Sequence, residues 1–144
     1  MKIELVIKGN AIPKQSAKFA NIGGFIKSYQ KKEVVNYANY IRYCFLEKYP
    51  NHNVEDFKNK ELQIHVIEYR KIPKSKSKKF QQQAEEKLVR PITKPDVDNI
   101  GKNVKDALNG VCYPDDSQIV KEINEKFYSN NPRLEVFVGD LCQE

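Results

Sequence analysis

Long apolar runs are missing from this sequence, and their absence excludes whole classes of protein. Its charge-free stretches are far shorter than the roughly 20 apolar residues that a membrane-spanning helix needs. The first residues, Met1 to Glu4, carry two charged side chains and not the apolar segment of a signal peptide. We therefore expect a soluble, cytoplasmic protein without a membrane partner.

Cysteine is scarce as well. Cys44, Cys112 and Cys142 lie far apart and form no Cys-x-x-Cys spacing, which argues against a zinc knuckle or a paired disulfide framework. We interpret all three as free thiols buried in the fold. A glycine-rich phosphate loop of the Gly-x-x-x-x-Gly-Lys type is also missing, so no nucleotide cofactor is expected.

Positive charge exceeds negative charge, but the two signs are unevenly distributed. The 144 residues carry a formal net charge of +6 with a pI near 9.1, which favours an anionic partner such as a phosphate backbone. Residues 70–79 hold six positive charges and no acid, whereas residues 96–116 hold five acids against two lysines. A metal-dependent nuclease needs this combination, because basic surface holds DNA while carboxylates hold divalent cations at the scissile phosphate.

The periodicity of apolar residues predicts a single α+β domain over residues 1–144. Four segments alternate apolar and polar residues and are expected to be strands: residues 2–8, 61–69, 118–127 and 133–138. Helices are expected at about residues 30–48, 75–90 and 99–109. The second of these has only a thin apolar stripe and should be exposed. Since strands and helices do not alternate regularly, we expect a mixed β-sheet packed by the two main helices.

The segments before and within the first predicted helix contain residues that suit nucleic-acid contacts. Residues 12–18 are predicted to form a basic loop, followed by a glycine turn and a short extended piece at residues 25–27. Three tyrosines recur at every third helical position: Tyr37, Tyr40 and Tyr43. They have the chemistry to stack on unpaired bases, but packing within the fold is the more ordinary explanation.

Asp96 and Asp98 form the leading candidate site. Pro95 biases the residues around it toward extended geometry, in which side chains two apart point to the same side and can share a metal. An EF-hand calcium loop is excluded, because Ile100 and Ala107 stand where that loop needs an oxygen ligand and a glutamate.

Asp98 has two further interpretations. It is a plausible N-cap of the helix predicted at residues 99–109, with Gly110 as the C-terminal stop. Lys102 follows Asp98 by one helical turn, so its ammonium group either stands near whatever Asp98 binds or forms a simple ion pair with Asp98.

Asp115 and Asp116 offer further carboxylates in the sequence Pro-Asp-Asp-Ser, which also suits a plain type I turn. They reach Asp96 and Asp98 only if the chain doubles back after the intervening helix. Oxygen-only donors without nearby His or Cys favour Mg²⁺ or Mn²⁺ over zinc, and phosphodiester hydrolysis is the natural reaction of such a site.

Two motifs together resemble the signature of a known family. The run KPDVDNIGKNVKDALNG at residues 94–110, followed by YPDDSQI at residues 113–119, closely resembles the RusA family of Holliday junction resolvases. The segment GNAIPKQS at residues 9–16 resembles, more weakly, the proline-lysine loop of that family. Ser16 and Lys18 stand where the family has arginines.

The resemblance implies a homodimeric, RusA-like α+β protein that is a Mg²⁺-dependent endodeoxyribonuclease. Such an enzyme resolves Holliday junctions by paired nicks during DNA recombination and repair, here in a phage or prophage setting. It implies that Asp96, Asp98 and Asp116 bind the metal, with Mn²⁺ as a possible substitute, and that Lys102 joins them in catalysis. Asp115, Asp106 and Asn99 are expected to support the site. The lysines expected to bind DNA are Lys14, Lys18, Lys74, Lys76, Lys78, Lys79 and Lys94.

Two other functions stay open on the sequence. A non-catalytic protein that binds branched or single-stranded DNA would use the basic loops and lose little if the carboxylates were neutralised. A nucleotidyltransferase also uses Asp-x-Asp, although the missing phosphate loop gives it no support. The substitution Asp98→Asn separates the nuclease from the binding protein.

Overall fold

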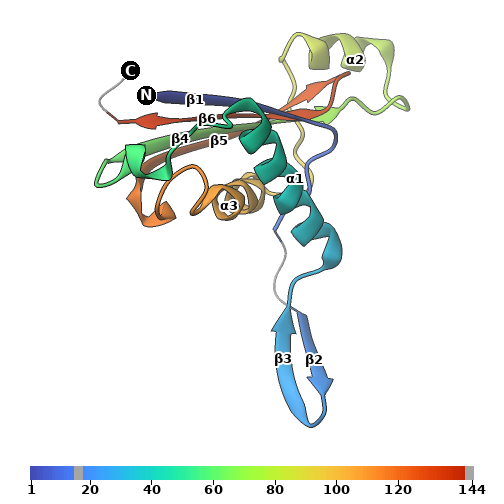
Figure 1. Cartoon of the computed structure of the whole chain (residues 1–144). Coiled ribbons are helices and arrows are strands. Elements are labelled where there is room, and N and C mark those ends of the chain that lie inside the picture. Colours follow the sequence, from blue (N-terminus) through green and yellow to red (C-terminus); the bar gives the residue numbers. More distant parts are fainter. Residues whose placement is uncertain (15–17, 142–144) are drawn as a thin grey trace.

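A four-stranded sheet forms the centre of the structure, a computed structural model in which residues 1–14 and 18–141 are described. The strand order is β1 (Lys2–Lys8), β6 (Arg133–Asp140), β4 (Leu62–Lys71) and β5 (Ile119–Ser129). β6 runs antiparallel to both of its neighbours, whereas β4 and β5 are parallel. The predicted mixed sheet is therefore confirmed (Figure 1).

Two helices cover one face of this sheet: α1 (Lys32–Lys48) and α3 (Val97–Leu108) (Figure 1). Each helix buries side chains spaced three or four residues apart, which places them on one side of the helix. On α1 these are Val34, Tyr37, Ile41 and Phe45, and on α3 they include Ile100, Val104, Ala107 and Leu108. All of these except Val34 meet the inward side chains of the strands in a single core, where burial of each large side chain contributes roughly 1.5–3 kcal/mol.

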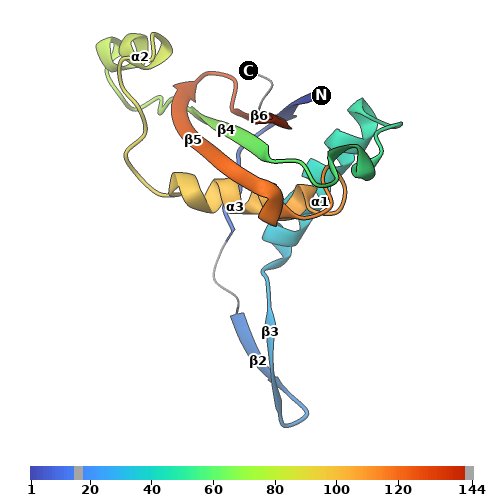
Figure 2. The same ribbon diagram turned by 90° about the vertical axis from the view of Figure 1, so that its left-hand side faces the viewer.

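A β-hairpin extends away from the body of the molecule (Figures 1 and 2). Its strands are β2 (Lys18–Ile22) and β3 (Phe25–Tyr29), joined by Gly23 and Gly24. Both glycines have positive φ, +58° and +82°, which a two-residue hairpin turn requires. Lys18, predicted to end a basic loop, is instead the first residue of a strand, because the glycine turn pairs it with Tyr29.

The exposed helix predicted at residues 75–90 is shorter in the structure. α2 spans Lys78–Glu85, and the Ser77 side chain caps it by accepting the Phe80 backbone N–H at 3.1 Å. The helix stops there because Lys87 adopts a left-handed φ of +63°, which leaves Leu88 exposed instead of on an apolar stripe. α2 lies on the opposite side of the sheet from α1 and α3 (Figures 1 and 2).

The remaining expectations about single residues are partly confirmed. Cys112 is buried and Cys44 is only half-buried, and both are free thiols, whereas Cys142 lies outside the described residues.

Of the three helical tyrosines, Tyr37 packs in the core, whereas Tyr40 and Tyr43 are exposed. Within the described part of the chain, no helix has both the length and the apolar character that crossing a membrane demands.

Candidate functional site

Asp96 stands at the N-terminal end of α3. Its backbone is extended, with φ −71° and ψ 151°, and its carbonyl accepts the Ile100 N–H at 3.4 Å. The N-cap is therefore Asp96 and not Asp98. The prediction that both aspartates share one extended segment is wrong, because the helical hydrogen bonds already begin at Asp96 and place Asp98 in the first turn.

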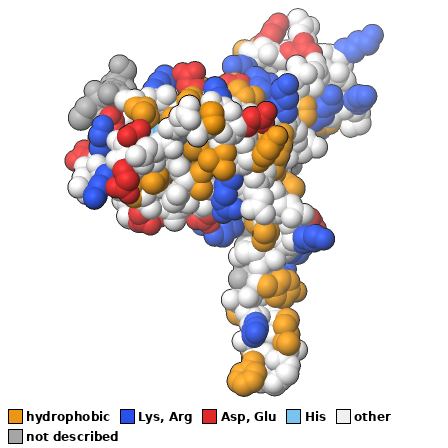
Figure 3. All heavy atoms as spheres, viewed as in Figure 1, with side chains coloured by type: hydrophobic (Ala, Val, Ile, Leu, Met, Phe, Trp, Pro, Cys, Tyr) orange, Lys and Arg blue, Asp and Glu red, His pale blue; other side chains and the backbone are white. Residues whose placement is uncertain are grey.

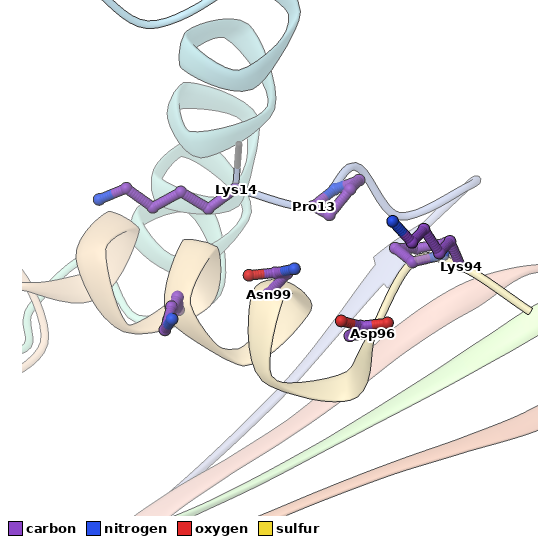
Figure 4. A pocket seen from close by; sticks show the side chains of 7 residues that line it. Pro13, Lys14, Lys94, Asp96 and Asn99 are labelled. Carbon is purple, nitrogen blue, oxygen red and sulfur yellow. The ribbon is translucent and has the colours of Figure 1, made fainter. Parts of the chain in front are cut away.

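A surface hollow of about 620 Å³ opens beside Asp96 (Figure 4). Its lining comes from two segments far apart in the sequence: Pro13, Lys14, Lys94, Pro95, Asp96, Asn99 and Lys102. The side chains of Asp96 and Asn99 rise from the start of α3 toward Pro13 (Figure 4). The fold thus brings the loop after β1 against the acidic motif. Three lysines and one exposed carboxylate line the hollow, a combination that suits an anion bound next to a cation.

Contacts with α3 hold the loop wall of this hollow in place. The backbone N–H of Lys14 donates to the Asn99 carbonyl at 3.0 Å, and the buried Asn103 side chain donates to the Ile12 carbonyl at 2.8 Å. The Lys14 ammonium group also pairs with the Asp106 carboxylate. Asp106 therefore has a structural contact, two turns beyond the acidic pair, that ties the loop to the helix.

Arg70 holds the opposite wall, the segment that leads into Asp96. Its guanidinium donates to the carbonyls of Thr93, Lys94 and Pro95 at 3.0–3.2 Å. The Glu68 carboxylate, which is 5% exposed, accepts two further hydrogen bonds from Arg70 at 2.8 and 3.0 Å. Sequence reasoning missed this role, since Arg70 looks like the first residue of a basic surface run and nothing local indicates that it points inward.

Asp98 and Lys102 form an ion pair across one helical turn. The Asp98 carboxylate and the Lys102 ammonium group lie 3.7 Å apart, and the two side chains are 61% and 56% exposed. Of the two interpretations of Lys102, the simple ion pair is the contact present in the structure. An exposed pair of this kind contributes at most about 1 kcal/mol to stability, so both groups stay available for a ligand.

Asp116 lies at the other end of α3. It begins the short 3-10 helix η2 (Asp116–Gln118), and its backbone N–H donates at 3.1 Å to the side chain of Asn109, the C-cap of α3. Twelve helical residues separate this end from Asp96, which corresponds to about 18 Å along the axis. The structure thus keeps Asp116 away from Asp96 and Asp98. Across residues 1–14 and 18–141, no three Asp, Glu, His or Cys side chains gather closely enough to hold a metal ion.

Asp115, the neighbour of Asp116, acts as a turn residue. Its carboxylate accepts the Ser117 backbone N–H at 3.1 Å and caps η2. Hydrogen bonds from the side chain and backbone of Ser117 lower the pKa of the Asp115 carboxyl. Asp115 thus forms a turn, as one interpretation of the sequence expects, but it does so as the extended N-cap of η2 and not as the second residue of a type I turn over Pro-Asp-Asp-Ser.

β5 returns the chain along α3 and brings Glu122 to the helix. The Glu122 carboxylate accepts hydrogen bonds at 2.7 Å from both Lys105 and Asn124. Gly101 allows this approach, because a Cβ atom there would lie 2.5 Å from the Asn124 side-chain oxygen. The chain after α3 does double back along the helix. The carboxylate that this brings next to α3 is that of Glu122 and not that of Asp115 or Asp116.

The pKa of Glu122 reflects this position. Burial is the largest influence and opposes ionisation, but the hydrogen bonds from Asn124 and Lys105, with the Lys105 charge, outweigh it and lower the pKa. The charge of Asp98 acts in the opposite direction, which places Asp98 and Glu122 within electrostatic reach of each other. The sequence did contain a signal, since Glu122 and Asn124 lie two apart on a predicted strand and so share a face.

The lysines predicted to bind DNA fall into separate groups. Lys14 and Lys94 line the hollow, and Lys18 lies on the hairpin. Four others are exposed just before and at the start of α2: Lys74, Lys76, Lys78 and Lys79. Basic side chains gather over α2 in Figure 3, on the side of the sheet opposite α3. The hollow and this second basic surface therefore lie on different parts of the molecule.

Fold and site together define a small α+β protein with a carboxylate-and-lysine hollow at a helix N-terminus. The family model described as endodeoxyribonuclease RusA matches residues 8–139, and the chain belongs to this family. The resemblance drawn from the two motifs is thereby confirmed. A curated relative, the uncharacterized protein YqaN of Bacillus subtilis (strain 168), is 48% identical over 92 residues. That match covers 62% of this chain and 65% of the relative, less than two thirds of its length.

Proposed function

We propose that the protein is a Mg²⁺-dependent endodeoxyribonuclease that cuts branched DNA, with four-way junctions as its substrate. The observation that carries this proposal is the hollow beside Asp96, which Lys14, Lys94 and Lys102 line together with this exposed carboxylate. A phosphodiester has the charge to bind such lysines, and the N-terminus of α3 adds a favourable dipole. Membership of the endodeoxyribonuclease RusA family supports the same activity.

Asp96 and Asp98 supply part of the ligand set that a hard divalent cation needs. Both carboxylates are exposed at the start of one helix, and oxygen donors of this kind suit Mg²⁺ or Mn²⁺. When bound there, the cation would supply Lewis-acid polarisation of a phosphate and activation of a water molecule. The chain itself contributes the lysines, which neutralise phosphate charge, and Asn99, whose side chain lines the same hollow.

A second copy of the chain is part of this proposal. Asp116 lies at the far end of α3, so one chain does not gather the three aspartates that the family motif implies. In a homodimer, Asp116 of the second subunit would complete the set begun by Asp96 and Asp98. Two-fold symmetry also suits a four-way junction, because paired nicks require two equivalent sites. Such paired cutting would serve DNA recombination and repair, in a phage or prophage setting.

The decisive experiment combines a labelled four-way junction and a matched linear duplex with Mg²⁺, Mn²⁺ or EDTA. We expect nicking of the junction with either metal and none in EDTA. Asp98→Asn should reduce nicking by about 100-fold or more while junction binding is kept or tightened, because a negative charge near phosphate is removed. Asp56→Asn is the matched control, since Asp56 is an exposed acid outside the site.

The alternatives give different results in the same assay. A non-catalytic DNA-binding protein would bind the junction and cut nothing under any condition. Unchanged nicking by Asp98→Asn would remove Asp98 from the catalytic set, and equal cutting of junction and duplex would reject selectivity for branched DNA.

A further inference from the structure

The β2–β3 hairpin exposes large apolar side chains that the fold itself does not use. Its exposed members are Phe19, Ile22, Phe25, Ile26 and Tyr29, with Phe19, Phe25 and Ile26 more than 70% exposed. No other element described in the structure covers either face of the hairpin, which stands away from the sheet and helices (Figures 1 and 2). A bare two-stranded sheet is marginally stable in water, so these side chains point to a contact outside the chain.

The two faces of the hairpin differ in chemistry. Directly opposed residues of an antiparallel pair share a face, and the register pairs Lys18 with Tyr29, Ala20 with Lys27 and Ile22 with Phe25. These six residues form what we call the lysine face, in which Lys27 lies between Phe25 and Tyr29 on β3 and Lys18 lies opposite Tyr29. The other, uncharged face consists of Phe19, Asn21, Ile26 and Ser28.

Charge identifies the kind of partner that the lysine face fits. Residues 14–32 contain five lysines and no aspartate or glutamate. No acidic side chain lies among these five lysines in the sequence, so an anionic partner supplies the charge that the segment itself lacks. A nucleic acid has a partner for both kinds of side chain on this face, since its phosphates neutralise lysines and its unpaired bases stack on aromatic rings.

The hairpin follows the loop of the candidate site closely in the sequence. Lys14, whose backbone N–H is bonded to Asn99 on the rim of the hollow, precedes the first residue of β2 by four positions. Each strand has five residues, so the hairpin reaches roughly 17 Å from its root. DNA with a phosphate in the hollow would therefore have its neighbouring nucleotides within reach of the hairpin.

We propose that the lysine face binds unpaired nucleotides, with Phe25 and Tyr29 stacking on bases while Lys18 and Lys27 neutralise the flanking phosphates. A continuous duplex hides its base faces in the stack, whereas a branch point or a single strand presents them. The hairpin is thus the element that distinguishes branched DNA from duplex. This inference rests on the proposed function in that it takes DNA as the ligand, but it needs no cleavage.

The absence of tryptophan from the sequence gives a direct test. Phe25→Trp places a single tryptophan on the lysine face, whose emission is excited separately from that of the tyrosines, and Phe19→Trp places one on the uncharged face as the matched control. Each protein is titrated in EDTA with an oligothymidylate, a four-way junction and a linear duplex. We expect the oligothymidylate and the junction to quench the fluorescence of the Phe25→Trp protein, with a midpoint that rises with salt, and the duplex to leave it unchanged. Equal quenching of the two proteins, or none of the Phe25→Trp protein, would overturn the proposal.

Competition binding provides the second measurement. Phe25→Ser combined with Tyr29→Ser should weaken junction binding about tenfold or more and leave duplex binding unchanged, because stacking is lost and charge is kept. Phe19→Ser combined with Ile26→Ser should weaken neither. Light scattering is run on the same proteins. Conversion of a dimer to a monomer by the first pair alone would show that the lysine face is a subunit contact and would overturn the proposal.

The two proposals fail in distinguishable ways. A wild-type protein that nicks junctions with Mg²⁺ while the Phe25→Ser and Tyr29→Ser pair binds them normally would contradict the hairpin's role and leave the nuclease standing. A wild-type protein that binds as expected but never nicks DNA would contradict the nuclease while leaving the hairpin's role standing.

Discussion

The side-chain oxygen of Asn109 accepts the backbone N–H of Asp116 at 3.1 Å, and this bond holds Asp116 at the C-terminal end of α3. Asp96 caps the opposite end of the same helix. Rotation of a side chain does not span a helix of about 18 Å. Under the proposed function, a metal site that includes Asp96, Asp98 and Asp116 would therefore be shared between two copies of the chain.

Complementation between two inactive variants tests this arrangement. Asp98→Asn and Asp116→Asn proteins are each expected to be inactive on a four-way junction. When the two are co-refolded, half of the dimers are mixed, and each mixed dimer has one site with every aspartate intact. About a quarter of wild-type nicking should return, as single nicks and not paired ones.

A second mixture is the control for this experiment. Asp96→Asn and Asp98→Asn change the same end of α3, so no mixed dimer of these two proteins restores a complete site. We expect no recovery there. If the first mixture also stays inactive while both single variants fold and dimerise, the site is not shared between subunits.

Removing Arg70 should destabilise the fold and misplace the site together. Arg70→Ala leaves the buried Glu68 carboxylate without its guanidinium partner, which costs about 3–5 kcal/mol. It also releases three backbone carbonyls at residues 93–95, just before Asp96. Urea unfolding measures the first effect and junction nicking the second.

The double variant Glu68→Leu with Arg70→Leu separates these two effects. It removes both buried charges, so most of the lost stability should return, whereas nicking should stay low because the carbonyls still lack their donor. Lys58→Ala is the control, since its exposed pair with Glu55 at 3.7 Å contributes at most about 1 kcal/mol. Full recovery of nicking by the double variant would contradict a positioning role for Arg70.

Glu122 should make stability depend on pH in the acid range. Its pKa in the folded protein lies below the ordinary value of 4.5, so the ionised group favours folding. This stabilisation is fully present above pH 4.5 and is lost as the pH falls from 4.5 through the lowered folded value. Glu122→Gln should therefore be less stable than the wild type at pH 7 in urea unfolding, and the difference should shrink toward pH 3. A difference that grows on acidification would show that the pKa is raised instead.

The two described cysteines should differ in reactivity. Burial raises the pKa of the Cys112 thiol to about 12, and the pKa of the half-buried Cys44 thiol is also raised, mainly by its smaller burial. Thiolates react with alkylating reagents, so Cys112 should stay unmodified at pH 8 until the protein is unfolded in urea. Mass spectrometry of peptides locates the modified sites, and Cys44 serves as the internal comparison. Equal modification of both thiols in the native protein would contradict the packing of Cys112.

Local patterns in the sequence were enough to predict much of the fold. The alternation of Ile3, Leu5 and Ile7 predicts β1, and the helical spacing of Val34, Ile41 and Phe45 predicts most of α1. These predictions succeed because each depends on neighbours a few residues away. The family, too, was readable from continuous motifs at residues 94–119.

Prediction from sequence was less accurate where local signals compete. The start of α3 was placed two residues too late, because Asp96 and Asp98 are both good N-caps and only the hydrogen bonds decide between them. Helix formers at residues 75–90 suggested a long helix that a left-handed Lys87 cuts short.

By itself the sequence determined the four strands of the main sheet, the two main helices and the acidic pair, since spacing along the chain and backbone geometry are enough for each. Only the tertiary structure decided that Lys14 joins Asp96 in one hollow, that Arg70 points inward, and that Asp116 lies at the C-terminal end of α3. These arrangements rest on hydrogen bonds and packing between residues distant in sequence, as with Lys14 and Asn99 or Arg70 and Pro95. The directions in which such side chains point are fixed only when the sheet and helices pack together.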